Sequence, residues 1–228
     1  AVPESPRWLA ARHRSADQPA PTPVRAEIFR PPLLHLTLVG ILLATIPMIG
    51  GWGSANWMNP WAEQAMEAAQ NPNRELKAQV VQARAFTGIL GSLIGGWVAS
   101  SFGRRRSYLL TSVICLLIAQ WTFWYVVPTD ASFLYWVSAL GFFSGLYFGW
   151  LPLCLPELFP TRVRSTGAGV SFNFGRILTA VTIFATGLLM TYFAGDYARI
   201  GRVTSLCFAL GVVAISLAPD TSQTSLDE

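Results

Sequence analysis

The arginine at position 176 lies in the middle of an apolar stretch that runs from residue 166 to residue 192. A helix rises about 1.5 Å per residue, so this stretch can cross a bilayer, and its midpoint lies only ~5 Å from Arg176. A charge at that depth costs roughly 2.5–3.5 kcal/mol on translocon scales, and such residues usually face a bundle interior or a water-filled path. Arg176 therefore indicates a route for a solute.

The neighbours of Arg176 on the expected helix strengthen this interpretation. At 100° per residue, one arc of about 60° collects a charge, an amide and small residues, namely Gly169, Asn173, Arg176, Ala180 and Gly187. This is the composition of a solvated cavity wall. The alternative is that Arg176 pairs with a carboxylate and locks helices together, but no carboxylate lies deep in the apolar stretches.

The amino-acid composition of the chain that positions these residues is that of a membrane protein. Of 228 residues, 52% are hydrophobic and 12% are charged, against about 25% charged in soluble domains. The net charge of +4 comes from clustered arginines, which indicate membrane topology and not nucleic-acid binding. The three cysteines fall in three different apolar stretches, so a disulfide framework is not expected.

The apolar stretches predict an all-α membrane protein with six transmembrane helices, over residues 33–52, 80–101, 108–127, 133–155, 166–192 and 203–218. Residues 1–32 are rich in proline and arginine and read as a solvated loop, and residues 219–228 form a tail. The longest loop, 53–79, is expected to be external and to hold a short surface helix over 59–69. Pro47 should bend the first helix.

The loops carry charge asymmetrically. Ten arginines lie before the first span and in the loops after the second and fourth spans, whereas the opposite loops hold four basic residues, Arg74, Lys77, Arg199 and Arg202. By the positive-inside rule both termini are expected in the cytoplasm.

Glycines recur at four-residue intervals in two of these helices, at Gly91 and Gly95 and at Gly141, Gly145 and Gly149. Such spacing lets helix backbones touch inside a membrane. General bundle packing and a moving seam between two helices both explain it.

Four short motifs resemble those of one family, and their order along the chain carries the resemblance. They are PESPRWL at 3–9, GWVASSFGRRR at 96–106, PELFPTRVR at 156–164 and APDT at 218–221. They resemble segments of sugar-porter-type members of the major facilitator superfamily, and imply the second half of a twelve-helix bundle whose N-terminal six-helix half is a missing partner. Ser100 replaces the acidic residue of the family's loop motif.

The resemblance also implies a conformational role for the loop residues Gly96, Gly103, Arg104, Arg105, Glu157, Arg162 and Arg164. Physically, Glu157 is placed to bridge the arginine triplet at 104–106 when the cytoplasmic side closes. The alternative is that these arginines only obey the positive-inside rule.

The expected substrate is a small organic solute. Residues 33–52 lack the glutamines and asparagine of sugar carriers, and the run 161–176 resembles metabolite and organic-anion proton symporters. In that context Arg176 would hold a carboxylate, with Asn173, Gln120 and Trp150 as further binding candidates.

The sequence therefore predicts a multi-pass plasma or inner-membrane secondary transporter that works by alternating access and is coupled to protons, whose acidic carrier would lie in the missing half. A neutral-solute or sugar facilitator, a non-transporting sensor or scaffold, and a homodimer of halves remain alternatives. No enzyme motif, metal-ligand cluster or cofactor site is found, so we expect no catalysis and no cofactor.

Overall fold

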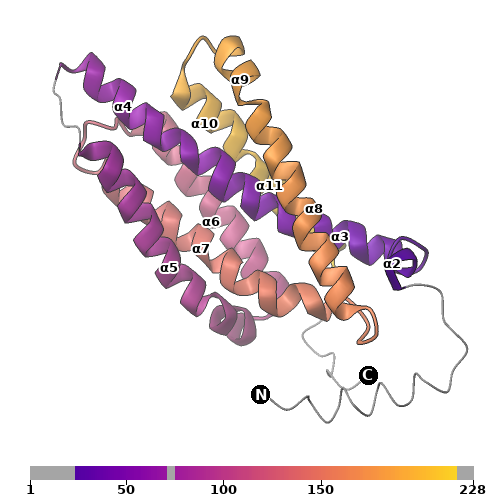
Figure 1. Ribbon diagram of the computed structural model, residues 1–228. Helices are drawn as coiled ribbons and strands as arrows, with labels where there is room; N and C mark the ends of the chain where they lie inside the picture. The colour runs from indigo at the N-terminus through magenta and orange to yellow at the C-terminus, as the bar shows by residue number, and fades with distance from the viewer. Residues whose placement is uncertain (1–23, 71–74, 220–228) are drawn as a thin grey trace, which may run out of the picture.

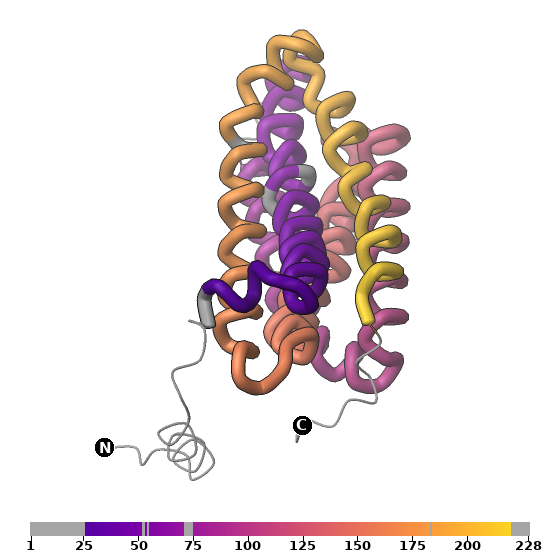
Figure 2. The backbone as a smooth tube through the Cα atoms, turned by 90° about the vertical axis from the view of Figure 1, so that its right-hand side faces the viewer, coloured from indigo at the N-terminus to yellow at the C-terminus, as the bar shows by residue number. Residues whose placement is uncertain are grey.

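The computed structural model describes residues 24–70 and 75–219, and this part of the chain is helical with no strand. Six helical segments are long and apolar enough to cross a membrane, each of 21 to 36 residues. They run roughly alongside one another in a single bundle (Figures 1 and 2). The predicted all-α fold with six transmembrane helices is confirmed.

The first span is a composite of four helical pieces that follow a short helix, α2 (Val24–Glu27). They are α3 (Leu33–Met48), the π-helix η1 (Ile49–Ser54), the 3₁₀ turn η2 (Ala55–Trp57) and α4 (Met58–Ala68). Glycine is a poor helix former, and η1 has the sequence IGGWGS, so the regular helix gives way there. Helix α4 lies where the sequence predicted a short helix over 59–69, and it follows the first span without a break in the helical run Leu33–Ala68.

The second, third and fourth spans are single helices, α5 (Leu76–Phe102), α6 (Arg104–Tyr125) and α7 (Phe133–Glu157). Helix α5 begins four residues before the predicted apolar stretch. Leu76, Lys77 and Gln79 are good helix formers, so the helix extends over them even though Lys77 and Gln79 are polar. Gly103, with φ of +88°, makes the tight junction between α5 and α6.

The fifth and sixth spans are each made of two helices. The fifth contains α8 (Arg164–Phe184) and α9 (Thr186–Tyr192), and the sixth contains α10 (Tyr197–Ser205) and α11 (Cys207–Leu217). The sixth starts at Tyr197, earlier than the apolar stretch, because the Asp196 side chain caps α10 by accepting a hydrogen bond from the Arg199 backbone N–H at 3.0 Å.

Four helix pairs dominate the packing: α5 with α7, α3 with α8, α6 with α7, and α6 with α11. In Figure 1 the first span runs between α5 and α8, and Figure 2 shows α8 and the α6–α11 pair on opposite edges. The first span therefore packs on α8 and α11 through α3, and on α5 through α4.

The contact between α5 and α7 is made by glycine backbones, as their spacing predicted. A methyl group added at Gly91 would overlap the Phe142 carbonyl, and one added at Gly145 would overlap the Gly88 carbonyl. Helices this close gain dispersion energy along their whole length, which replaces the hydrophobic effect inside a membrane. We call this contact the glycine seam.

Proline 47 lies inside α3 and leaves a buried carbonyl without its usual partner. In a regular helix the N–H of residue 47 would donate to the Leu43 carbonyl, and proline has no N–H. The hydroxyl of Tyr108 on α6 donates to that oxygen at 3.0 Å, and both residues are fully buried. A side chain from the third span thus satisfies the backbone of the first.

Candidate functional site

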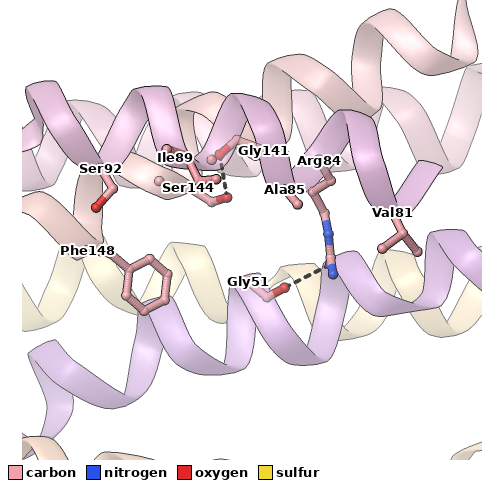
Figure 3. A pocket seen from close by; sticks show the side chains of 11 residues that line it. Gly51, Val81, Arg84, Ala85, Ile89, Ser92, Gly141, Ser144 and Phe148 are labelled. Atoms are coloured by element: carbon pink, nitrogen blue, oxygen red, sulfur yellow. Dashed lines mark hydrogen bonds between the residues drawn. The ribbon is translucent and has the colours of Figure 1, made fainter. Parts of the chain in front are cut away.

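A pocket of about 460 Å³ lies where α5, α7 and η1 meet. Its walls are mostly apolar or backbone, and its polar side chains are one arginine and two serines (Figure 3). The lining residues are Val81, Arg84, Ala85, Gly88, Ile89 and Ser92 of α5, Gly141, Ser144, Gly145 and Phe148 of α7, and Gly51 of η1. A concave, largely apolar site with few polar groups is typical of small-molecule binding.

The glycine seam forms one wall of this pocket. Gly88, Gly141 and Gly145 bring the backbones of α5 and α7 together and also line the pocket. Because these residues have no side chains, the space beside them stays open, whereas larger residues would fill it. The pocket therefore follows from the same small residues that pack the two helices.

Among the described residues that line the pocket, Arg84 is the one cation. Its guanidinium reaches from α5 to the first span, where it donates to the Gly51 carbonyl at 3.1 Å and to the Asn56 side-chain oxygen at 2.7 Å (Figure 3). Both acceptors are neutral, so the positive charge of Arg84 is held by hydrogen bonds without a counter-ion in this contact. A half-buried cation whose partners among the described residues are neutral attracts an anionic ligand.

Both acceptors belong to the irregular part of the first span. Gly51 lies in η1 and Asn56 lies in η2, so Arg84 bridges α5 to the segment in which α-helical geometry is lost. Single π-helical turns are frequent at functional sites, because they turn backbone groups away from the regular ladder.

Arg176 and Asn173, the first sequence candidates, lie on the exposed face of α8. The opposite face packs on α3 through Ser171, Gly175 and Thr179, all buried. The Asn173 amide donates to the Gly169 carbonyl at 2.8 Å, whereas Arg176 makes no hydrogen bond or ion pair with any residue that the structure describes. Arg176 does not line the pocket of Arg84.

Gln120 and Trp150 lie at helix contacts away from the pocket. The Gln120 amide donates to the Arg202 carbonyl and to the Ser205 hydroxyl, both at 2.8 Å, and so links α6 to α10. The Trp150 indole is buried and donates to the Arg104 carbonyl at 2.9 Å. Their predicted part in solute binding stays a prediction.

The charged residues between the second and fourth spans do come together. The Arg104 guanidinium donates to both oxygens of Glu157, at 3.2 and 3.0 Å, and also to the Ala99 carbonyl at 3.3 Å. One arginine thus joins the ends of α5, α6 and α7. This is the contact between Glu157 and the arginine triplet that the sequence suggested; its role in conformational change stays a prediction.

The remaining loop candidates make separate contacts. Arg105 donates to the Ser216 carbonyl at the end of α11 at 3.1 Å, and Arg162 pairs with Glu27 of α2. Arg164 donates to the Phe159 carbonyl at 3.3 Å. Gly96 lies beside the Gly149 carbonyl, at the end of the glycine seam that is nearer to Gly103 in the sequence. Gly103 forms the α5–α6 junction described above.

Sequence reasoning missed Arg84 although it lies inside the predicted second span. The signal that identified Arg176, a charge within an apolar stretch, applied equally to Arg84. Its position four residues inside the predicted start made it resemble an end-of-helix anchor.

The geometry can now be compared with known proteins. The model of the Major Facilitator Superfamily matches residues 2–183. The chain is 32% identical over 136 residues to the inner membrane metabolite transport protein YhjE of Escherichia coli, covering 58% of this chain and 30% of that protein. It is 26% identical over 155 residues to the cis,cis-muconate transport protein of Acinetobacter baylyi, covering 68% and 36% respectively.

A third relative, the shikimate transporter of Escherichia coli, is 27% identical over 124 residues, which cover 47% of this chain and 28% of the relative. The chain thus matches only about a third of the length of these relatives, and no solved structure matches it. The relatives are transporters and not enzymes, in agreement with the sequence prediction. With its six apolar helices and a family match over most of its length, this multi-pass membrane chain belongs to the Major Facilitator Superfamily.

Proposed function

We propose that this chain forms six helices of a secondary transporter that moves small organic anions by alternating access. The observation that carries the proposal is Arg84, a cation with neutral partners on the wall of a pocket of about 460 Å³ whose other lining is mostly apolar. Two relatives that are named for carboxylates, muconate and shikimate, support the same substrate class.

The proposed chemistry at Arg84 is an exchange of hydrogen-bond acceptors. A guanidinium has five N–H donors in a fork that fits a carboxylate, and a charge-assisted pair is stronger than a bond to a neutral oxygen. An anion in the pocket would therefore compete with Gly51 and Asn56 for the same donors. Ser92 and Ser144 offer hydroxyls for a second polar group of the solute.

The exchange would also connect binding to movement. When Arg84 turns to the anion, η1 and η2 lose their link to α5, and the first span becomes free to change its bend at the three glycines of the IGGWGS segment. In this scheme, when the pocket is empty, the bonds from Arg84 to Gly51 and Asn56 hold the first span in the described shape.

Arg176 and Asn173 complete the proposed route. Their face of α8 is exposed in these six helices, and we expect the remaining helices of the transporter to enclose it. Proton coupling would then need a titratable group near the ends of these spans or in the remaining helices, because no acid lies in the apolar middle of a span. The acids from residue 33 to residue 217 are Glu63, Glu67, Glu75, Asp130, Glu157 and Asp196.

Uptake of labelled muconate, shikimate and neutral inositol into proteoliposomes of the full-length protein tests the proposal. We expect Arg84→Gln to weaken apparent anion affinity at least about tenfold, since hydrogen bonds to charged groups contribute roughly 1.5–3 kcal/mol each. Arg84→Lys should recover part of it. Arg199→Gln, at an exposed surface arginine, is the matched control.

The Asn56→Ala variant distinguishes a role of Arg84 in anion binding from a purely structural role in linking α5 to the first span. It removes one competitor for Arg84, so the exchange predicts a severalfold gain in anion affinity, the opposite sign to Arg84→Gln. If both variants weaken uptake alike, Arg84 is only a structural brace. If inositol is carried better than the carboxylates, the proposed substrate class is wrong.

A further inference from the structure

A second, smaller pocket of about 320 Å³ lies on another surface, between the start of α6 and the end of α11. It is lined by Arg105, Arg106 and Leu109 of α6 and by Val212, Ile215 and Ser216 of α11. The two helices lie side by side at one edge of the bundle, away from α8 (Figure 2). It shares no residue with the pocket of Arg84.

The charged end of this pocket favours an anion. Arg105 donates to the Ser216 carbonyl, so its guanidinium is fixed at the pocket rim. Arg106 is exposed and has no hydrogen-bond or ion-pair partner in the described ranges 24–70 and 75–219. The first turn of α6 adds its positive helix end and contains no acidic residue, and Glu157, the nearby acid in the loop cluster, is bound by Arg104.

The other end of the pocket is apolar and continues along α6. Leu109 in the pocket wall is 37% exposed, and exposed apolar side chains follow it along α6 toward the middle of the span, with Leu110 52%, Val113 37% and Leu117 62% exposed. Within the part of the chain that the structure describes, nothing covers this strip. In a membrane such a surface meets acyl chains.

From these two ends we infer that the α6–α11 pocket binds an anionic phospholipid, with the phosphate at Arg105 and Arg106 and an acyl chain along the apolar strip. Basic groups at the membrane surface attract anionic lipids by about 1 kcal/mol each, or about fivefold in affinity. A soluble phosphate could bind the same two arginines, but it has no acyl chain to contact the apolar strip. The charge and the adjoining apolar surface together match a lipid.

The lipid would also hold the ends of two spans together. Because Arg105 already joins α6 to the last turn of α11, a phosphate bound between Arg105 and Arg106 would add a second link at the same place.

Native mass spectrometry of the full-length protein with phosphatidylglycerol and phosphatidylcholine tests the inference. We expect selective retention of phosphatidylglycerol, about fivefold weaker in Arg106→Gln and weaker still in the double variant with Arg105→Gln. Arg106 makes no hydrogen bond or ion pair with the described residues, α11 among them, so its variant reports binding without loosening that helix. Arg199→Gln, on α10 far from the pocket, should bind lipid normally.

Competition with inorganic phosphate and with glycerophosphoglycerol, the soluble headgroup, separates a lipid site from a simple anion site. We expect neither to displace the lipid at equal concentration. Equal retention of both lipids, unchanged retention in Arg106→Gln, or displacement by either soluble competitor would each overturn the inference. Anion uptake through the pocket of Arg84 is a separate readout, so failure of one proposal leaves the other intact.

Discussion

The hydrogen bond from Tyr108 to the backbone beside Pro47 gives a sharp test of how this membrane bundle is stabilised. Replacing Tyr108 with phenylalanine keeps the ring and removes one oxygen. The Leu43 carbonyl then loses the donor that stands in for the N–H that residue 47 lacks. An unsatisfied buried carbonyl costs about 1–3 kcal/mol, and we expect the free energy of unfolding to fall by that amount.

A double-mutant cycle assigns the loss to its cause. Pro47→Ala supplies a backbone N–H at position 47 that can donate to the Leu43 carbonyl, so Tyr108→Phe should cost markedly less in that background. Tyr147→Phe is the matched control. Tyr147 is an equally buried tyrosine whose hydroxyl partner, Ser112, keeps another hydrogen bond at 2.9 Å. We expect it to cost less than about 1 kcal/mol.

The measurement is the unfolding free energy of the full-length protein in mixed micelles during a titration with denaturing detergent. The reasoning is refuted if Tyr108→Phe costs the same with proline or alanine at position 47. A loss no larger than that of Tyr147→Phe would likewise show that the Leu43 carbonyl needs no partner.

Two further predictions concern the helix contacts. Gly145→Ala places a methyl group on a backbone carbonyl of α5 and should destabilise the protein by about 1–3 kcal/mol, whereas Gly169→Ala, at a glycine with open space around it, should be neutral or stabilising in the same detergent titration. Glu157→Ala leaves Arg104 without its bidentate partner, so the buried thiol of Cys154 one turn away should react severalfold faster with a maleimide; an unchanged rate would argue against a closing role for the ion pair.

The helices could be predicted because their signals are local. Each span is a continuous apolar stretch, and the seam between α5 and α7 follows from glycines four residues apart. Helix ends were harder to predict, since Asp196 starts α10 through a side-chain cap well before the apolar stretch begins. Polar residues that continue a helix beyond the apolar stretch carry no hydropathy signal.

The pocket could not be predicted because its contacts join distant parts of the chain. Arg84 bonds to residues 28 and 33 positions away, and Gln120, which the sequence suggested as a solute ligand, uses its amide on residues 82 and 85 positions away. Whether a polar side chain within a span faces a cavity or satisfies a neighbouring helix depends on tertiary packing. Periodicity along one helix does not contain that information.

The broken first span has one more consequence, which concerns its neighbours. Below η1, α3 packs mainly on α8, and above it α4 packs on α5 and α10. The span therefore changes partners at the same turn where its helical geometry changes (Figure 1). The two parts of the span are thus held by different sets of helices, and Arg84 links the turn between them to α5.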